Sequence, residues 1–389
     1  MKKLLMLFVM LFACCMVVAC GKEEERTSIK LGSAGPLAGS VAVYGTAVQK
    51  GVELAIEEIN AAGGVDVNGT KYPFELVDFI NDDADPTKSA AALNTLVGKD
   101  VDVVVGAVTS GATEGLIGEA VKVGVPVITP TGTADKLTVG EDGKQRANRE
   151  NIFRACFYDS YQGRFMAEYA KEQGYEKVFI LYNNDEPYSV GLKDAFTKTA
   201  EGLGVEIKSV GYPGISTVFD TYWATIKAEG YSCVYVPDYY EKVYSVVKAA
   251  GEADYEGVIY GGDGWDGVIT QYEDEFDTSV MAQCVYTNHF FSGAEVETVK
   301  KFVANYKAKY NNEVPVSFAA LGYDAVYMVK QAIEAADSVE YEAVVEALAS
   351  TTFTGLVTSS EPFQFVDGSP AKNVVYVAFD EEGKEVEAK

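Results

Sequence analysis

Histidine is nearly absent from this 389-residue chain, which has only His289. A Ser-His-Asp triad is therefore possible only through that residue, and the chain has no Gly-x-Ser-x-Gly turn. Histidine and cysteine are too few and too scattered for a zinc site. The glycines of residues 32–45 match neither the dinucleotide fingerprint nor the P-loop with its lysine. These absences argue against an enzyme and predict no cofactor and no metal.

Basic residues are also scarce: 32 lysines and arginines stand against 58 acidic residues, for a formal net charge of −26. A chain of this charge repels nucleic acid and anionic membrane surfaces. The sequence therefore predicts no nucleic-acid partner. Because the acidic residues are spread over positions that we expect to face solvent on helices, the charge does not point to a particular substrate.

Cysteine is used sparingly, with six residues in all. Cys14, Cys15 and Cys20 lie near the start, which leaves the widely spaced Cys156, Cys233 and Cys284 in the body of the chain. An exported chain with this spacing has no disulfide framework. We expect these three residues to be small members of the core.

Long apolar runs are missing after the first 20 residues. Lys2 and Lys3 precede an apolar run, Leu4 through Ala19, which is shorter than the ~20 residues that cross a bilayer. Residues 1–19 therefore read as a signal peptide. The run ends in Val-Val-Ala-Cys-Gly, which resembles a lipobox with Cys20 as the lipidated residue, followed by a polar tether over residues 20–27. Cys14 also fits the pattern, but cleavage there would leave an apolar stub, so Cys20 is favoured.

The central feature of the sequence is a pair of strand-to-turn units. Val101 through Val105 has the composition of a buried parallel strand, and Gly106 through Gly115 is small and hydroxylated before helical spacing resumes. We expect Ser110 and Thr113 at the N-cap of that helix, where free N–H groups and the helix dipole favour an anion. A second unit follows at Val125 through Asp135. Neighbouring strand ends of this kind hold ligands in open parallel sheets, although ordinary β–α connections have the same composition.

Strand and helix patterns alternate through most of the chain, with a polar stretch at residues 140–151 that is typical of a crossing between domains. The alternation occurs twice and predicts two doubly wound α/β lobes. At the end of the chain, Phe363–Val366 and Val374–Phe379 read as a hairpin-like pair of strands.

An acidic residue between glycines, Asp263, follows a buried-looking strand of the second half. Glycines on both sides permit close approach of a ligand. If Asp263 faced Ser110 and Thr133 across a cleft, the site would suit a zwitterion, with the carboxylate on the hydroxyls and the ammonium on the aspartate. Taken alone, a solvated loop residue is the simpler interpretation of Asp263.

Several motifs together resemble one family, the branched-chain amino acid substrate-binding proteins of ABC transporters, which have the type I periplasmic binding fold. They are the Gly-Pro-Leu-Ala-Gly-Ser opening at residue 35, Ile-Asn-Ala-Ala-Gly-Gly at 59, Asp-Asp-Ala-Asp-Pro at 82, and the two strand-end units above. The resemblance implies that Ser110 and Thr133 bind the ligand carboxylate, and that the Thr131 carbonyl and Asp263 bind its ammonium. It also implies a set of residues that line or close the pocket: Tyr44, Val108, Thr109, Tyr188, Tyr239 and Phe318. Some relatives carry a disulfide between the positions of Ala84 and Thr109, and this chain has neither cysteine.

The resemblance further implies a three-crossover hinge between the lobes, with lobe 1 at residues 28–152 plus 288–355 and lobe 2 at residues 153–287 plus 356–389. It implies a monomeric lipoprotein on the outer face of the bacterial cytoplasmic membrane, held through Cys20. This lipoprotein would bind a branched-chain amino acid and deliver it to an ABC transporter permease. The same scaffold with another amino acid, a short amide or urea as ligand, or a sensor module for a membrane receptor, stays open as an alternative.

Overall fold

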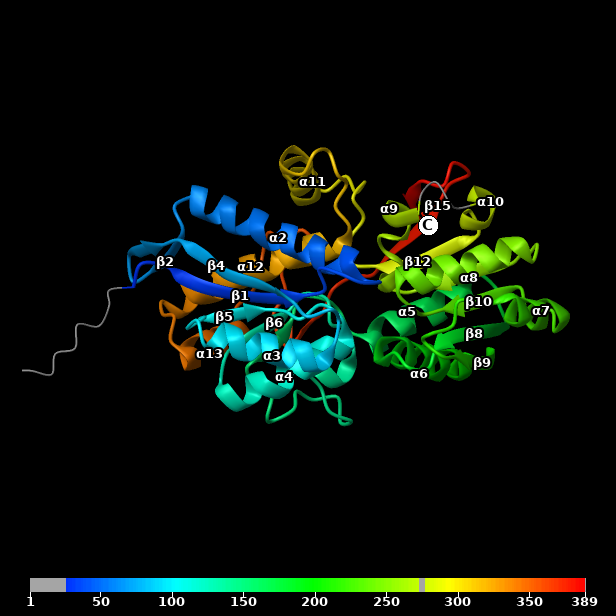
Figure 1. Cartoon of the computed structure of the whole chain (residues 1–389), viewed down its shortest axis with the longest axis horizontal. Coiled ribbons are helices and arrows are strands. Elements are labelled where there is room, and N and C mark those ends of the chain that lie inside the picture. Colours follow the sequence, from blue (N-terminus) through cyan, green and yellow to red (C-terminus); the bar gives the residue numbers. More distant parts are fainter. Residues whose placement is uncertain (1–25, 273–276, 389) are drawn as a thin grey trace, which may run out of the picture.

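The computed structural model describes residues 26–272 and 277–388. It has two lobes side by side along the long axis of the molecule (Figure 1). The predicted signal peptide, Cys20 and most of the tether lie outside the described residues. Within the described part of the chain, no helix combines the length and apolar character that a membrane span needs.

Lobe 1 is built on a five-stranded parallel sheet in the order β4-β1-β5-β6-β7. Its strands are β1 (Ile29–Gly35), β4 (Phe74–Asn81), β5 (Val103–Val105), β6 (Val127–Thr129) and β7 (Ile152–Arg154). Helices α2 and α12 lie over one face of this sheet and α3 and α4 over the other (Figure 1). Their bounds, with those of the two outer helices, are α2 (Ala42–Ala61), α3 (Pro86–Val97), α4 (Ser110–Val123), α11 (Glu297–Lys309), α12 (Ser317–Ala336) and α13 (Tyr341–Ser350).

Lobe 2 contains a seven-stranded sheet in the order β16-β15-β12-β11-β10-β8-β9. The strands are β8 (Lys177–Asn183), β9 (Glu206–Tyr212), β10 (Cys233–Val236), β11 (Val258–Gly261), β12 (Cys284–Asn288), β15 (Val375–Phe379) and β16 (Glu385–Glu387). The larger helices are α5 (Asp159–Glu172), α6 (Pro187–Gly202), α7 (Asp220–Ala228) and α8 (Tyr240–Glu252), and the shorter α9 (Val268–Tyr272) and α10 (Thr278–Met281) follow. The five strands from β8 to β12 are parallel, and β15 and β16 add to the edge in antiparallel sense.

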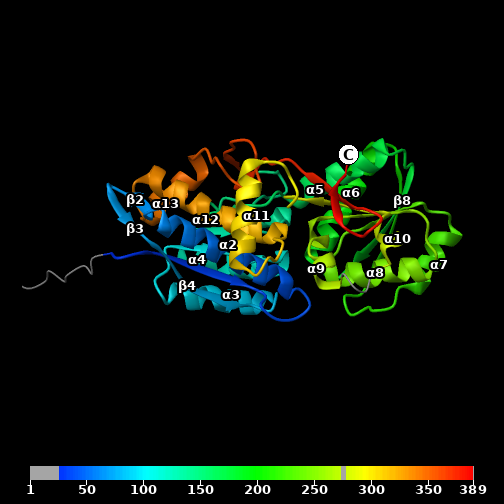
Figure 2. The same ribbon diagram turned by 90° about the horizontal axis from the view of Figure 1, so that it is seen from above.

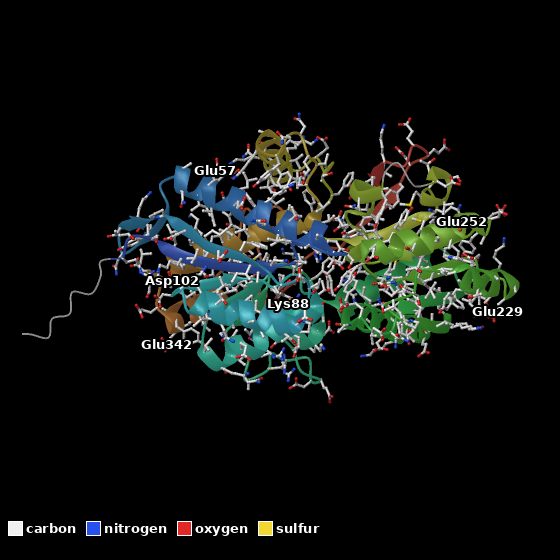
Figure 3. The ribbon with its side chains drawn as sticks, viewed as in Figure 1. Glu57, Lys88, Asp102, Glu229, Glu252 and Glu342 are labelled. Carbon is white, nitrogen blue, oxygen red and sulfur yellow. The ribbon has the colours of Figure 1, made fainter. Side chains whose placement is uncertain are left out.

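The cores form beneath the apolar faces of the helices. The apolar positions of α2, among them Val48, Val52 and Ile59, are buried. Cys156, Cys233 and Cys284 are free thiols in the interior, as expected from their spacing. Acidic side chains such as Glu57, Glu229 and Glu252 point outward from the helices (Figure 3). The net negative charge is therefore carried largely by solvent-facing positions.

The predicted pairing of the last two strands is wrong. β15 pairs with β12 and β16, while Phe365 and Val366 form a small hairpin, β13 (Phe365–Val366) with β14 (Ser369–Pro370). This hairpin belongs to lobe 1, because Arg154 of β7 donates its N–H to the Gly368 carbonyl at 3.0 Å. The chain therefore enters lobe 2 for the last time between Pro370 and Val375, later than the expected residue 355.

The other two crossings follow β7 and β12. Seen from above, the red C-terminal strand lies within the green and yellow lobe, and the orange helices lie within the blue one (Figure 2). Segments that are distant in sequence are thus interleaved between the lobes. The two small remaining strands, β2 (Val65–Val67) and β3 (Thr70–Tyr72), form a hairpin at the outer end of lobe 1.

Candidate functional site

The first wall of the candidate site is the pair of strand ends that the sequence singled out. β5 leads through Val108 and Thr109 into α4, with Thr109 at the N-cap and Ser110 as the first helical residue. Ser110 and Thr113, both predicted at the N-cap, therefore lie within the first turns of the helix, and the Thr109 side chain makes no capping hydrogen bond. The Ser110 hydroxyl accepts a hydrogen bond from the Ala134 backbone N–H at 3.2 Å. The hydroxyl thus joins the first strand end to the second.

Threonine hydroxyls hold the two loops together. Thr131 donates to the Val108 carbonyl at 2.7 Å, and Thr129 donates to the Ala107 carbonyl at 2.8 Å. Both threonines are buried. Because their hydroxyls are already paired, they fix the loops and leave the Thr131 carbonyl as the group that this residue can offer to a ligand.

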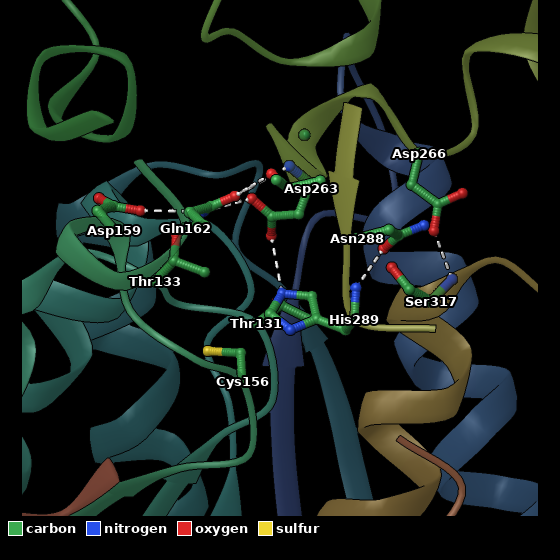
Figure 4. A network of polar contacts seen from close by, with 12 residues as sticks. Thr131, Thr133, Cys156, Asp159, Gln162, Asp263, Asp266, Asn288, His289 and Ser317 are labelled. Carbon is green, nitrogen blue, oxygen red and sulfur yellow. Dashed lines mark hydrogen bonds and ion pairs between the residues drawn. The ribbon is translucent and has the colours of Figure 1, made fainter. Parts of the chain in front are cut away.

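The second wall comes from lobe 2 and is centred on Asp263, which follows β11 at the start of a single 3-10 turn. One carboxylate oxygen accepts from Gln162 Nε2 at 2.8 Å and from the Tyr188 hydroxyl at 2.7 Å. The other lies 3.1 Å from His289 Nε2 (Figure 4). Asp263 is only 2% exposed. Buried carboxylates need such donors, so these three residues hold the charge in place.

His289 occupies the second crossing between the lobes, directly after β12. Its ring stacks on Phe157, with the centroids 3.6 Å apart. Burial lowers the pKa of His289, and the neighbouring Asp263 opposes that effect. The only histidine of the chain is therefore a partner of the candidate ligand-binding carboxylate.

Aromatic rings close the space between the walls. Tyr188 and Tyr239 of lobe 2 stack in parallel, with centroids 4.8 Å apart. Tyr44 of lobe 1 stacks on Phe318 at 4.0 Å, and its ring meets the edge of Tyr239 at 5.6 Å. The tyrosines and the phenylalanine thus form one continuous aromatic cluster across the lobe boundary.

A small enclosed cavity lies between the walls. Its lining is Val108, Thr109, Thr131, Thr133, Tyr188, Tyr239, Asp263, Gly264 and Phe318. Eight of these nine are residues that the sequence analysis selected, and they come from both lobes. Ser110 and Tyr44 are not among these nine residues but adjoin them: Ser110 accepts from the N–H of Ala134, the residue after Thr133, and Tyr44 stacks on Phe318. Gly264 is an addition that the sequence analysis did not select.

Carboxyl groups dominate the surroundings of the cavity on the lobe 2 side. Burial raises the pKa of Asp159, next to Thr133, and negative charge on Asp135 and Asp263 adds to the effect. Burial also raises the pKa of Glu186, near Tyr239, to about 7. A ligand with a cationic end would be favoured at this wall. Within the described residues, no cluster of His, Cys, Asp and Glu is arranged to hold a metal ion.

Sequence reasoning missed the partners of Asp263. Gln162 lies 101 residues before it and His289 lies 26 residues after it. No spacing rule connects positions on a helix, a strand end and a crossing. The only hint that Asp263 has such partners is the general rule that a buried carboxylate requires hydrogen-bond donors.

Comparisons with known proteins identify the family of this chain. A family model described as periplasmic binding protein matches residues 28–384. This chain belongs to the periplasmic binding protein family. The membership confirms the predicted resemblance and the type I fold. The family consists of binding proteins, which agrees with the absence of catalytic motifs in the sequence.

Among its relatives, this periplasmic binding protein is 31% identical to the Leu/Ile/Val-binding protein BraC3 of Rhizobium johnstonii, over 83% of this chain and 84% of that one. It is 29% identical to the leucine-, isoleucine-, valine-, threonine- and alanine-binding protein of Pseudomonas aeruginosa, over 84% and 83% of the two chains. The branched-chain amino acid transporter protein LivJ of Streptococcus pneumoniae, solved with isoleucine, superposes with a TM-score of 0.81 at 30% identity, over 93% of this chain and 100% of that one. A Rhodopseudomonas palustris protein with benzoate shares the fold at 22% identity, with a TM-score of 0.78 over 92% and 95% of the two chains.

Proposed function

We propose that this protein is the extracytoplasmic substrate-binding component of an ABC importer and binds a branched-chain amino acid between its lobes. The observation that carries the proposal is the small cavity between the lobes, with Thr131 and Thr133 on one side and Asp263 on the other. Hydroxyls and a helix N-terminus suit a carboxylate, and a fixed aspartate suits an ammonium. The names of the relatives support the choice of ligand class.

The ligand is a zwitterion in this proposal, because each of its charges meets an opposite partner. The ammonium binds Asp263 and the Thr131 carbonyl. The carboxylate binds at Ser110 and Thr133, and the apolar side chain lies against Tyr44, Phe318, Tyr188 and Tyr239 together with Val108 and Thr109. Burying both charges is favourable only when each is paired and hydrogen-bonded. The ammonium site and the carboxylate site therefore both contribute to selectivity for a zwitterion.

Calorimetric titration with leucine, isoleucine and valine tests this proposal, using residues 21–389 to avoid the lipid anchor. Two leucine analogues separate the charges: the α-keto acid of leucine lacks the ammonium, and the amine left after loss of the carboxylate lacks the other charge. We expect binding of the amino acids and at least tenfold weaker binding of both analogues. Tight binding of an amide, of urea or of the keto acid, with weak binding of every amino acid, would reject the branched-chain assignment.

We also propose that the mature protein is a monomer, anchored to the outer face of the cytoplasmic membrane through a diacylglycerol on Cys20, from where it delivers ligand to a permease. The sequence Val-Val-Ala-Cys-Gly supports the lipid site. Metabolic labelling with a radioactive fatty acid tests it. The wild-type chain should take up label and Cys20→Ser should not, whereas equal labelling of the two would refute the anchor.

A further inference from the structure

A short segment of lobe 2, Gly264 to Gly267, touches lobe 1 beside the cavity. The Gly264 carbonyl accepts a hydrogen bond from the Tyr44 hydroxyl, which in turn accepts from the Tyr240 N–H at 3.1 Å. Gly267 has a φ of 92°, and a Cβ on it would lie 3.1 Å from Val43 of lobe 1. The segment that follows Asp263 is thus an inter-lobe contact and not a free loop.

Within that segment, the Asp266 carboxylate caps a helix of the other lobe. It accepts a hydrogen bond at 2.5 Å from the backbone N–H of Ser317, the first residue of α12 (Figure 4). The helix has no cap of its own, because the preceding residue, Val316, provides no side-chain hydrogen bond. Asp266 is 3% exposed. A 20-residue helix of lobe 1 is therefore capped by a carboxylate of lobe 2.

This contact contributes free energy to the closed arrangement of the two lobes. The first N–H groups of a helix lack partners within the helix, and the helix dipole favours a negative charge at that end. When the lobes separate, the carboxylate and the N–H group both return to water. The contact therefore stabilises the closed arrangement alone, and it adds nothing to the stability of either lobe by itself.

Both partners of this capping contact, Ser317 and Asp266, are also linked to the candidate ligand site. Phe318, the residue after Ser317, lines the cavity and stacks on Tyr44. Burial raises the pKa of Asp266, and negative charge on Asp263 raises it further. An ammonium bound to Asp263 would reduce this repulsion between the two carboxylates. Ligand binding and capping should therefore favour each other.

We propose that Asp266 is a latch residue, which sets ligand affinity by holding the lobes closed without touching the ligand. The proposal rests on the proposed function, because it assumes that the ligand lies between the lobes. Asp266 does not line the cavity. Its loss should accelerate the escape of ligand and leave the initial encounter unchanged.

Stopped-flow fluorescence with isoleucine tests the latch, since the neighbouring Trp265 is buried and provides a signal. In Asp266→Ala we expect the dissociation rate to rise about 3- to 30-fold, the range that a helix cap supports, with an unchanged association rate. Asp266→Asn should restore most of the slow dissociation, because the amide oxygen also caps helices well.

The matched control is Asp85→Ala. Asp85 caps α3 within lobe 1, accepting from Thr87 and Lys88 at 2.8 and 2.9 Å. Its loss should lower the melting temperature and leave the dissociation rate unchanged. If Asp266→Ala dissociates at the wild-type rate, or if Asp85→Ala accelerates dissociation equally, the latch is refuted.

A second readout works without ligand. Spin labels on the exposed Glu57 and Glu252, one in each lobe, report the inter-lobe distance distribution. The closed population should fall in Asp266→Ala, and an unchanged distribution would also refute the latch. If no amino acid binds the wild-type protein, the proposed function is wrong. The inter-lobe distances measured without ligand still test whether Asp266 holds the lobes closed.

Discussion

In the proposed binding mode, Asp263 is the residue that pairs with the ligand ammonium. In Asp263→Asn, we expect the affinity for a branched-chain amino acid to fall at least 100-fold, because the ammonium loses its charged partner in a buried site. Calorimetry measures the change. Asp82→Asn is the control, since Asp82 is a fully buried carboxylate of lobe 1 outside the cavity lining. Wild-type affinity in Asp263→Asn would show that the ammonium binds elsewhere.

His289 should make ligand affinity depend on pH. Burial lowers the pKa of His289 below the usual range of a histidine, so the ring is neutral at pH 7 and gains a proton only in more acidic solution. A protonated ring would compete with the ligand ammonium for Asp263, and the complex would bind fewer protons than the free protein. Affinity should therefore fall as the pH drops from 6.5 to 5. Titrations across this range should show a smaller decrease in His289→Gln, and the same decrease in both proteins would contradict this role.

At the scale of residues, sequence reasoning succeeded where a local rule applies. Thr131 and Thr133 follow a short buried strand, and parallel strands end at one edge of a sheet, so their proximity to Val108 and Thr109 was predictable. Gln162 reaches Asp263 from the first turns of α5, and His289 reaches it from a crossing. These contacts depend on how the second lobe folds as a whole, which no local pattern specifies.

At the scale of elements, the packing of α2 on α12 depends on glycine. A Cβ on Gly51 would lie 2.0 Å from the Ala319 carbonyl oxygen, and one on Gly322 would lie 2.8 Å from the Val48 carbonyl oxygen. In Gly51→Ala, the two helices would have to separate, and we expect a loss of about 2–4 kcal/mol in the free energy of unfolding. Urea unfolding measures this loss.

Gly118→Ala provides the matched control for that substitution. Gly118 also lies within a helix, α4, but a Cβ there would have no neighbour within 4 Å. Alanine should be neutral or stabilise the protein by up to about 1 kcal/mol, because glycine is the poorer helix former. If both variants lose the same stability, close helix approach is not the reason for Gly51.

The sequence predicted the alternation of strands and helices in both lobes, because hydrophobic periodicity reports which face of an element is buried. It failed for the partner of β15. Val375–Phe379 has strand composition, but its partner is determined by the open edge of β12 in lobe 2. Phe365 and Val366 pair locally and stay with lobe 1. Strand composition does not specify a distant partner, so the last crossing was placed too early.

At the scale of the whole molecule, acidic conditions should stabilise the fold. Burial raises the pKa of Asp82 and Asp238 to about 6, and that of Glu186 and Glu385 to about 7. The folded state therefore binds more protons than the unfolded chain between about pH 4 and pH 7, and the free energy of unfolding rises as the pH falls through this window. The melting temperature should be several degrees higher at pH 5.5 than at pH 7.5.

Scanning calorimetry at the two pH values checks this expectation. His289 and Lys372 act in the opposite direction, because their lowered pKa values favour the unfolded state as the pH falls, but the four carboxyl groups with raised pKa values outnumber them. Asp82→Asn and Glu186→Gln together should reduce the difference between the two melting temperatures. A wild-type protein that melts at a lower temperature at pH 5.5 would contradict the assignment of these groups.

The interleaving of the lobes has a consequence for how the chain matures on the ribosome and during export. Glu58 of α2 accepts a hydrogen bond from Tyr323 of α12, 265 residues later, so lobe 1 remains unfinished until nearly all of the chain has been made. The five parallel strands of lobe 2, β8 to β12, are consecutive in the sequence, so this part of its sheet can form earlier and gain the edge strands β15 and β16 last. A chain truncated after residue 316 should therefore keep lobe 1 protease-sensitive, and a protease-resistant lobe 1 in that truncation would contradict this order. A polypeptide that must thread through a secretion pore would gain from this delay, because lobe 1, which emerges first, stays incomplete until most of the chain has followed.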